Sequence, residues 1–200
     1  MTPTMRRSRL AAWLLRRMGW TLLQPELPGP KGIIVVYPHT SAADFFVGLL
    51  AKWALGWPVH FWAKHSLFRW PLVGRWLRYL GGVSVRRQKA HGLVAQTLAA
   101  MQAADWFWLA IAPEGTRSAG AGWRTGFYHV WQQANVPLGV AILDYQGRTV
   151  GVRAFLTCTG DIQVDFERIA QCVGEVHGYR AHCAAPVQPL SSTPSTTVTP

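Results

Sequence analysis

The sequence predicts an α/β fold: a single domain built on a mixed, largely parallel sheet that is flanked by helices. Short apolar runs that are typical of buried strands, such as Gly32–Tyr37 and Trp106–Ala112, alternate with longer segments expected as helices, such as Ser41–Leu55 and Lys89–Ala104. Strands that alternate with helices are typical of βαβ units, whose strands run parallel. A length of 200 residues suits one domain with its own core.

Residues 1–27 are expected to form a basic amphipathic helix. Over Met5–Leu23, apolar residues recur near helical spacing, and most arginines lie elsewhere on the helix. A basic amphipathic helix that carries Trp can lie in a membrane interface, although it can also dock on the domain as an ordinary helix; we favour the interface. A proline-rich break follows. The apolar positions are Leu10, Trp13, Leu14, Met18 and Leu22.

Residues 28–183 are expected to hold the α/β domain, and residues 184–200 a disordered tail that is uncharged and rich in Pro, Ser and Thr. Within the domain, Pro71 kinks or begins a basic helical region, because proline is tolerated mainly in the first turn of a helix. In chain order, the further expected elements are a strand at Val59–Ala63, the helical region Ser66–Leu80, a strand at Gly82–Val85, a helix at Trp123–Ala134, strands at Val136–Leu143 and Thr149–Leu156, and a helix within Ile162–Tyr179.

The chain is strongly basic, with 20 Lys and Arg residues against 9 Asp and Glu residues and a net charge of +11. The excess is concentrated in two stretches: no acid precedes Glu26, and none lies between Asp44 and Asp105. One-signed stretches of this kind indicate an anionic partner, which is nucleic acid, an anionic membrane or a phosphorylated substrate.

The 11 Trp residues favour the membrane over nucleic acid. Trp suits membrane interfaces because its ring is apolar and its N–H donates a hydrogen bond. Trp also stacks on nucleic-acid bases, but here the Trp residues fall within apolar segments rather than polar loops. Some of them, including Trp106 and Trp108, are expected to fill the core. Because no apolar run reaches 18 residues, a simple membrane span is not expected. We expect a peripheral or monotopic protein at the cytoplasmic face.

The cysteines do not indicate a metal site. Cys158, Cys172 and Cys183 are few, odd in number and lack the spacing of metal ligands. We expect reduced thiols and no bound metal.

His39 and Asp44 directly follow a predicted strand, and ligands of an open α/β sheet bind outside the carboxyl ends of its strands. Imidazole can take a proton from a hydroxyl and return it to a leaving group, and a carboxylate behind it fixes its tautomer. Residues five apart lie roughly 140° apart on an ideal helix. The two side chains can therefore pair only if His39 lies in the turn and Asp44 in the first helical turn. Asp44 can also cap that helix together with Ser41.

A second polar stretch, Pro113–Ser118, follows another predicted strand. Gly115 allows a sharp turn or a close approach to a ligand, and Arg117 can bind phosphate through two hydrogen bonds. Glu114 has two candidate partners, an acceptor hydroxyl or Arg117 in a surface salt bridge. We expect this loop and His39 to share one crevice.

With these motifs the sequence resembles the glycerolipid acyltransferases, the group that includes lysophosphatidic acid acyltransferase. The segment His39–Asp44 matches the His-x-x-x-x-Asp motif of that family, and Pro113–Arg117 matches Pro-Glu-Gly-Thr-Arg. A looser Gly-rich motif corresponds to Gly81–Arg87, and a fourth motif to Val136–Pro137. The resemblance extends over about Lys31–Tyr145.

The resemblance implies that His39 is a general base, oriented by Asp44, that deprotonates an acceptor hydroxyl for direct attack on an acyl thioester. It implies no bound cofactor and no acyl-enzyme. The sequence departs from the family at Arg86, where an acid is usual, and at Ala112, where a bulky aromatic residue often stands. The implied substrate-binding residues are Lys64, Arg87, Glu114, Gly115, Thr116 and Arg117.

The function that follows is transfer of a fatty acyl group from acyl-CoA or acyl carrier protein to 1-acyl-glycerol-3-phosphate, which gives phosphatidic acid in phospholipid biosynthesis. The expected partners are this lysophospholipid, the thioester donor and anionic membrane lipid, with no nucleic acid. Two alternatives stay open. The acceptor can be another lysophospholipid or an amino-acid-derived lipid with a free hydroxyl, or the chain can be a non-enzymatic basic protein that coats membranes or nucleic acid.

Overall fold

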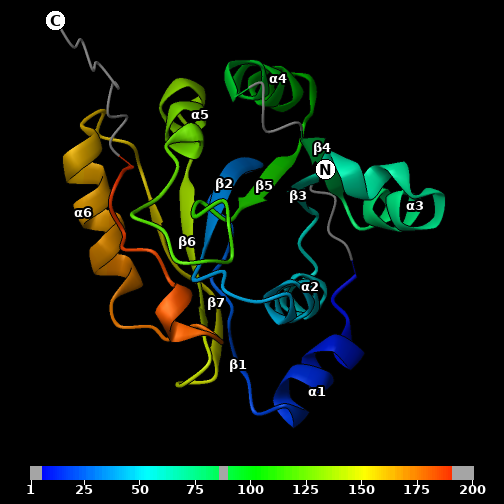
Figure 1. Cartoon of the computed structure of the whole chain (residues 1–200). Coiled ribbons are helices and arrows are strands. Elements are labelled where there is room, and N and C mark those ends of the chain that lie inside the picture. Colours follow the sequence, from blue (N-terminus) through cyan, green and yellow to red (C-terminus); the bar gives the residue numbers. More distant parts are fainter. Residues whose placement is uncertain (1–5, 86–89, 191–200) are drawn as a thin grey trace, which may run out of the picture.

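The computed structural model describes residues 6–85 and 90–190, and its described strands form one seven-stranded sheet in the order β1-β7-β6-β2-β5-β3-β4 (Figure 1). Neighbouring strands are parallel except for β6 and β7, which are antiparallel. The predicted α/β domain with a mixed, largely parallel sheet is therefore confirmed. The strands are β1 (Thr21–Leu23), β2 (Lys31–Tyr37), β3 (Val59–Lys64), β4 (Gly82–Val85), β5 (Phe107–Ile111), β6 (Leu138–Asp144) and β7 (Thr149–Leu156).

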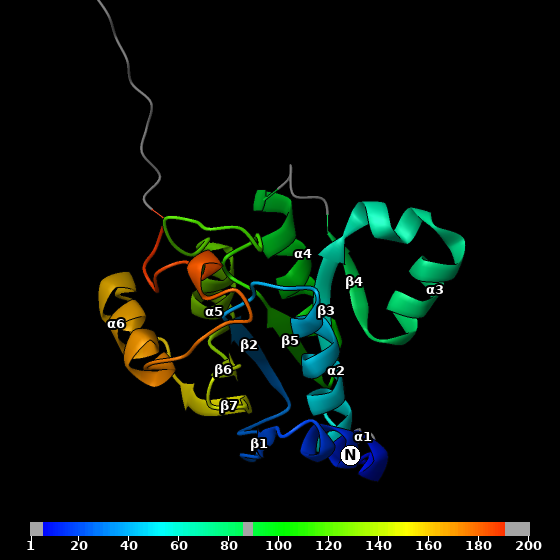
Figure 2. The same cartoon turned by 60° about the horizontal axis from the view of Figure 1, so that its bottom comes forward.

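Helices cover both faces of the sheet because successive side chains of a buried strand point to opposite faces. On β2, Ile33 and Val35 pack toward α5 and α6, whereas Ile34 packs toward α2. Helices α1 and α2 lie on one face, and α4, α5 and α6 lie on the other (Figures 1 and 2). The helices are α1 (Arg9–Arg17), α2 (Ala43–Leu55), η1 (His65–Arg69), α3 (Pro71–Tyr79), α4 (Ala90–Ala103), α5 (Gly126–Ala134), α6 (Ile162–Val173) and η2 (Ala181–Cys183), where η denotes a 3₁₀ helix.

The N-terminal segment differs from its prediction. Helix α1 ends at Arg17, and Gly19 follows with a φ of 78°, a left-handed conformation that glycine adopts readily. The chain then continues as strand β1, which pairs in parallel with β7. Helix α1 itself buries Ala11 and Leu15 in a cluster with residues of α2. Residues 1–27 are therefore not a separate helix: their described part supplies one helix and one edge strand to the domain.

Other element ends move for identifiable local reasons. Pro71 begins α3 rather than kinking a longer helix, as its fixed φ and missing N–H favour at the first helical position. Helix α6 falls within its predicted range and ends at Val173, where Gly174 takes a φ of 56°.

The C-terminal segment 184–190 is packed against the domain, which contradicts the expected disorder in this part of the chain. Ala185 is buried, and its N–H donates to Glu114. Pro189 forms an isolated β-bridge with Trp123, whose side chain is fully buried. Apolar and backbone partners thus order a segment whose composition alone favours disorder. Residues 191–200 lie outside the described residues.

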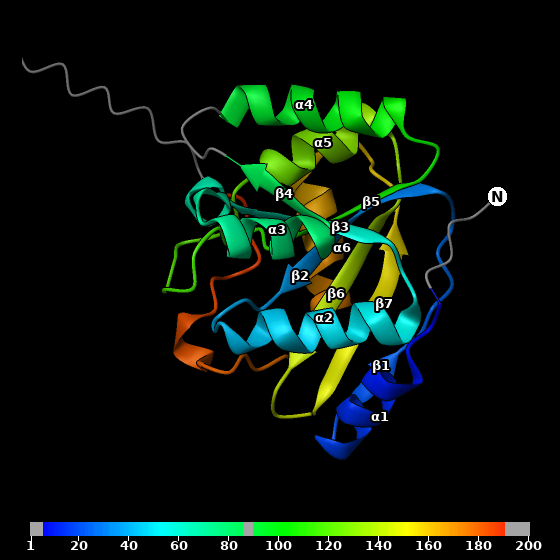
Figure 3. The ribbon, with the colours of Figure 1, turned by 90° about the vertical axis from the view of Figure 1, so that its right-hand side faces the viewer.

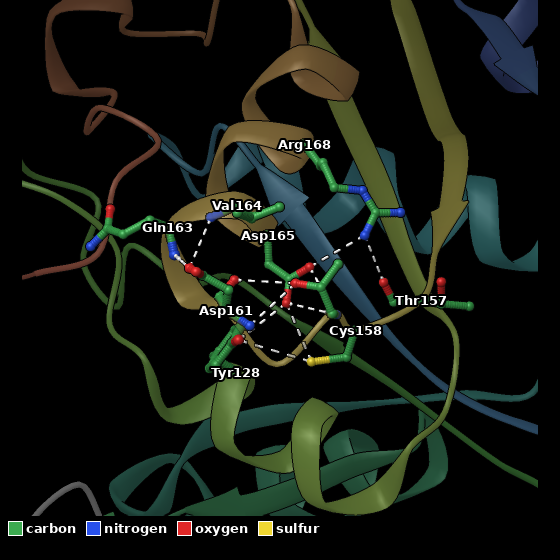
Figure 4. Close-up of polar contacts among 9 residues, drawn as sticks. Tyr128, Thr157, Cys158, Asp161, Gln163, Val164, Asp165 and Arg168 are labelled. Carbon is green, nitrogen blue, oxygen red and sulfur yellow. Dashed lines mark hydrogen bonds and ion pairs between the residues drawn. The ribbon is translucent and has the colours of Figure 1, made fainter.

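A buried carboxylate anchors α6 (Figure 4). Asp165 has an exposed fraction of 0% and accepts hydrogen bonds from the Tyr128 hydroxyl at 3.1 Å and from the Thr159 N–H at 3.0 Å. The Cys158 thiol lies 3.4 Å from the same carboxylate, and Arg168 pairs with it at 3.3 Å. Burial alone would raise the pKa of Asp165, but these hydrogen bonds outweigh it and lower the pKa. The network joins α6 to α5 and to the end of β7.

The Trp residues range from fully buried to exposed, and Trp106, which was expected in the core, is partly buried. Trp108, Trp123 and Trp131 are fully buried, so the expected core role of Trp108 is confirmed. Trp13 and Trp70 are exposed, although large aromatic side chains are usually buried. Among the described residues, no helix combines the length and apolarity needed to span a bilayer.

Candidate active site

Two turns meet at the carboxyl edge of the sheet because β2 and β5 are adjacent and parallel. The chain leaves β2 at Tyr37 and enters α2 at Ala43, so His39 lies in the connecting turn. The Pro113–Ser118 loop directly follows β5 on the neighbouring strand. The sheet topology therefore brings the two motifs together at one edge, where the His39 N–H donates to Glu114.

His39 and Asp44 form a pair in the predicted geometry, with Nδ1 of His39 3.3 Å from Oδ2 of Asp44. Asp44 lies in the first turn of α2, and its side chain is almost completely buried, whereas the His39 side chain is 28% exposed. With Nδ1–H donated to Asp44, the lone pair of a neutral imidazole is on Nε2. Nε2 makes no hydrogen bond to any described residue, so it is free to accept a proton.

Asp44 also fixes the turn that carries His39. Its Oδ2 accepts the N–H groups of Thr40 and Ser41, both at 2.7 Å. The cap position of α2 is Ala42 rather than the expected Ser41, whose hydroxyl instead accepts the N–H of Ala43 at 3.1 Å. Asp44 therefore orders the start of α2 and also lies next to the imidazole of His39, so one carboxylate makes both kinds of contact that its two candidate roles require.

Tyr145 completes the surroundings of Asp44. Its hydroxyl donates to Oδ1 of Asp44 at 2.8 Å from just beyond the end of β6. Burial would raise the pKa of Asp44, but hydrogen bonds from His39, the Ser41 backbone and Tyr145 outweigh burial and lower the pKa. Asp44 is thus ionised at neutral pH and can stabilise an imidazolium at His39.

Glu114 binds the backbone of the protein itself. It is only 3% exposed, and its two oxygens accept the N–H of His39 at 2.6 Å and the N–H of Ala185 at 2.9 Å. It makes no ion pair with Arg117, one of its two candidate partners. Burial raises the pKa of Glu114, against the lowering effect of both backbone hydrogen bonds. The side chain fastens the His39 turn to the loop after β5 and to the C-terminal segment.

The rest of the Pro113–Ser118 loop is more open. Gly115 has a φ of 66°, as expected for a sharp turn, and Thr116 and Arg117 are exposed. Arg117 makes no hydrogen bond or ion pair with a described residue, so its guanidinium is available to a ligand. A second exposed arginine, Arg124, packs over the loop: a Cβ on Gly115 would lie 2.5 Å from its Nε. A second cation, which the sequence analysis did not single out, therefore lies against the loop that carries Arg117.

The two remaining predicted phosphate-binding residues have different outcomes. Lys64 is exposed at the carboxyl end of β3, on the same edge of the sheet as His39. Arg87 lies outside the described residues.

Sequence reasoning missed the contribution of the segment after α6. The N–H of Arg180 donates to the hydroxyl of Thr40 at 3.1 Å, and Thr40 is fully buried. Gly178 passes so close that a Cβ there would lie 2.8 Å from the same hydroxyl. Nearby, the Tyr145 N–H donates a hydrogen bond to the carbonyl of His177 at 2.8 Å. No local pattern signals these contacts, because their partners lie far apart in sequence.

Comparison with known proteins shows the family of this chain. Residues 8–142 match the model of the acyltransferase family. The chain belongs to this family. The match confirms the resemblance that the two motifs indicate.

A solved structure shares the fold. The 1-acyl-sn-glycerophosphate (LPA) acyltransferase PlsC from Thermotoga maritima is similar with a TM-score of 0.55 and 15% sequence identity, over 82% of this chain and 73% of that one. No curated protein matches the sequence.

This acyltransferase has an apolar cavity of about 210 Å³ between α2 and the sheet, with His39 in its lining. The cavity exists because small residues face one another: Gly48 and Ala51 on α2 oppose Ala110 and Ala141 on the sheet. For scale, an engineered apolar cavity of roughly 150 Å³ holds a benzene molecule. A hydrocarbon chain fits the character of this space.

Besides His39 and Asp44, two polar side chains interrupt the apolar lining, Lys52 and His60. Lys52 donates a hydrogen bond to the carbonyl of Leu80, and burial lowers its pKa to about 8. Burial also lowers the pKa of His60, and the charge of Lys52 adds to this effect. Lys52 lies eight residues beyond Asp44 on α2, or about 12 Å along the helix axis. The apolar space therefore acquires polar groups at a distance from His39.

Proposed function

We propose that this acyltransferase moves a fatty acyl group from acyl-CoA or acyl carrier protein to the free hydroxyl of a lysophospholipid. The first candidate acceptor is 1-acyl-glycerol-3-phosphate, and the product is phosphatidic acid in phospholipid biosynthesis. The observation that carries the proposal is the position of His39. Its ring lines an apolar cavity, an ionised carboxylate lies behind it, and the exposed cation Arg117 belongs to the adjoining loop.

In the proposed reaction, Nε2 of His39 removes the proton of the acceptor hydroxyl as the oxygen attacks the carbonyl carbon of the thioester. The tetrahedral intermediate then expels the thiolate, the C–S bond breaks, and the imidazolium returns the proton to sulfur. Asp44 holds Nδ1–H and stabilises the imidazolium between these steps. Proton transfer of this kind contributes about 10²–10⁴-fold to a rate.

The remaining residues are assigned by chemistry. The cavity between α2 and the sheet would take the acyl chain, since its lining is almost entirely apolar. Arg117 and Lys64 are exposed cations at the same sheet edge and would bind the phosphate of the acceptor. Glu114 would position the His39 turn rather than contact the substrate, because backbone N–H groups occupy both of its oxygens. We place the reaction at the cytoplasmic face of the membrane.

The decisive experiment supplies purified protein with labelled acyl thioester and a panel of lyso-lipids with and without a phosphomonoester. We expect turnover of 1-acyl-glycerol-3-phosphate, and a fall of about 10²-fold or more for His39→Ala with the fold intact. His129→Ala is the matched control, because His129 is exposed on α5, on the other face of the sheet. Substantial residual turnover in His39→Ala would refute the assignment, and preference for a phosphate-free acceptor would redirect it to an amino-acid-derived lipid.

A further inference from the structure

An exposed apolar face covers η1 and α3. It consists of side chains that project into solvent although they are large and hydrophobic. Leu72 and Tyr79 are each 86% exposed, and Trp70 is 70% exposed. We call this surface the docking face, and its apolar residues are Leu67, Trp70, Leu72, Val73, Trp76 and Tyr79.

Folding of the domain does not account for this exposure. Helix α3 buries Gly74 and Leu77 toward the protein. Leu72, Trp76 and Tyr79 follow one another at intervals of four and three residues, so they lie within roughly 60° of one another on the opposite side of the helix. An ordinary surface helix places polar residues there. Helix α3 thus has one apolar stripe for the core and a second one for a partner.

The docking face is preformed rather than a loose loop. Gly74 of α3 lies directly against η1, because a Cβ on it would be 2.7 Å from the carbonyl oxygen of Phe68. The guanidinium of Arg78 lies over the ring of Phe68 at 5.6 Å. Binding therefore needs little ordering of the backbone.

Charge identifies the partner as anionic. Arg69, Arg75 and Arg78 are exposed on η1 and α3. The sequence contains no acid between Asp44 and Asp105, so nothing in this region neutralises them locally. Long cationic side chains beside an apolar stripe suit a lipid surface, where the stems lie along the acyl boundary and the charges reach the head groups.

The aliphatic residues favour a membrane over nucleic acid. Single-stranded nucleic acid binds aromatic platforms and cations, and that would leave the exposed Leu67 and Leu72 without a function. A bilayer interface takes up aliphatic side chains together with Trp and Tyr. Helix α1, which exposes Leu10 and Trp13, lies with α2 and α3 on the side turned toward the viewer in Figure 3.

Aromatic contacts connect the docking face to the cavity. Phe45, which lines the cavity, packs edge-to-face against Trp76 of the docking face, with their ring centroids 6.2 Å apart. It also contacts Phe46, which is 58% exposed, and Phe61 in the cavity lining. An acyl chain that leaves a bilayer at this face would meet apolar side chains along its path to the cavity.

We propose that the docking face binds one leaflet of a membrane that carries anionic lipid, with α3 lying along the interface. The inference rests on the proposed function only for the passage of the acyl chain, and the binding itself is independent of turnover. Trp70, Leu72 and Trp76 enter the head-group region, and the three arginines attract the anionic head groups.

Vesicle co-sedimentation of the full-length chain tests this. We expect binding to phosphatidylcholine vesicles that contain phosphatidylglycerol, weaker binding to phosphatidylcholine alone, and weakening by salt. Each of Arg75→Gln and Arg78→Gln should weaken binding about fivefold. Leu72→Glu should weaken it more than tenfold, whereas the control Val164→Glu, at an exposed apolar position on α6, should not change it. Circular dichroism confirms that each variant is folded.

Three outcomes would overturn the inference. The first is equal vesicle binding by Leu72→Glu and Val164→Glu, and the second is that Leu10→Glu loses vesicle binding while Leu72→Glu keeps it. The third is that the wild-type protein binds an RNA homopolymer but does not bind vesicles. Turnover of a water-soluble short-chain acceptor by the wild type is measured in parallel. Its absence would refute the proposed function and leave the vesicle result to decide the docking face.

Discussion

The hydroxyl of Tyr145 donates to Oδ1 of Asp44 at 2.8 Å and joins the end of β6 to the start of α2 behind His39. A hydrogen bond to a buried charged group contributes about 1.5–3 kcal/mol. Tyr145→Phe should therefore lower the free energy of unfolding by about that amount and reduce turnover by loosening Asp44. Tyr79→Phe, at a tyrosine that is largely exposed, is the control. Urea unfolding of both variants at pH 7 provides the measurement.

The same variant predicts a change with pH. The pKa of Asp44 is lowered in the folded state, so its contribution to stability is present above the unfolded value of about 4 and is lost as the pH falls through the folded value. Loss of the Tyr145 hydrogen bond moves the folded pKa upward. Acid unfolding of Tyr145→Phe should accordingly begin at a higher pH than in the wild type. Parallel acid-unfolding curves with an unshifted midpoint would contradict this role.

Glu114 should matter through position rather than through contact with substrate. Glu114→Gln replaces one accepting oxygen with an NH₂ group that faces a backbone N–H of His39 or Ala185. We expect a loss of about 1–3 kcal/mol in unfolding free energy, together with a lower kcat and little change in KM for the acceptor. Glu167→Gln, at an exposed position on α6, should be silent in both assays. A variant that raises KM alone would return Glu114 to the substrate-binding residues.

Arg117 should behave in the opposite way. Because Arg117 is exposed and contacts no described residue, Arg117→Ala should leave the unfolding free energy within about 0.5 kcal/mol of the wild type. A charge-assisted hydrogen bond to phosphate is worth about 1.5–3 kcal/mol, so KM for a phosphorylated acceptor should rise about tenfold or more. Steady-state kinetics with a phosphorylated and a phosphate-free acceptor provide the measurement. An equal loss for both acceptors would show that Arg117 does not recognise phosphate.

The central strands and their helices could be predicted from sequence because their signals are local. Strand β2 is an uninterrupted apolar run with turn residues at its end. The segment that forms α2 follows directly, with Ser41 and Asp44 at its start as helix-starting signals. The edge strand Thr21–Leu23 could not be predicted in this way, because its apolar residues continue the helical periodicity of α1. Only its pairing with β7 makes this segment a strand. The prediction of disorder for the segment 184–190 is wrong for a similar reason: the partners that order it, Trp123 and Glu114, are distant in sequence.

The candidate site divides along the same line. His39 and Asp44 lie five residues apart, so both the spacing and its geometric consequence are visible in the sequence. The hydrogen bond from Tyr145 to Asp44 joins residues 101 positions apart in the sequence, and the one from Ala185 to Glu114 joins residues 71 positions apart. A single sequence carries no signal for pairing over such separations. Glu114 was recognised as important through its motif. Its partners are backbone N–H groups, which no side-chain pattern reports.

The Asp165 network predicts a stability effect without an effect on chemistry. Asp165→Asn places an NH₂ group among the donors Tyr128 and Thr159, which should cost about 3 kcal/mol. The pKa of Asp165 is lowered in the folded state, so its stabilisation is full above the unfolded value of about 4 and is lost as the pH falls through the folded value. The difference between variant and wild type should therefore shrink in acid. Asp161→Asn is the control, since Asn caps a helix as well as Asp does.

Gly48 offers a direct test of the cavity. It lines the cavity from α2, and a Cβ there would meet no atom within 4 Å, so a larger side chain can enter the empty space without disturbing the backbone. Gly48→Phe should keep the protein folded, because replacing a helical glycine gains up to about 1 kcal/mol of helix propensity. It should also shift the preferred donor to shorter acyl thioesters by filling part of the space for the chain. Gly48→Ala is the matched control, since one methyl group removes little volume. Competition among thioesters of graded length measures the shift, and an unchanged profile in a folded Gly48→Phe variant would mean that the acyl chain binds outside this cavity.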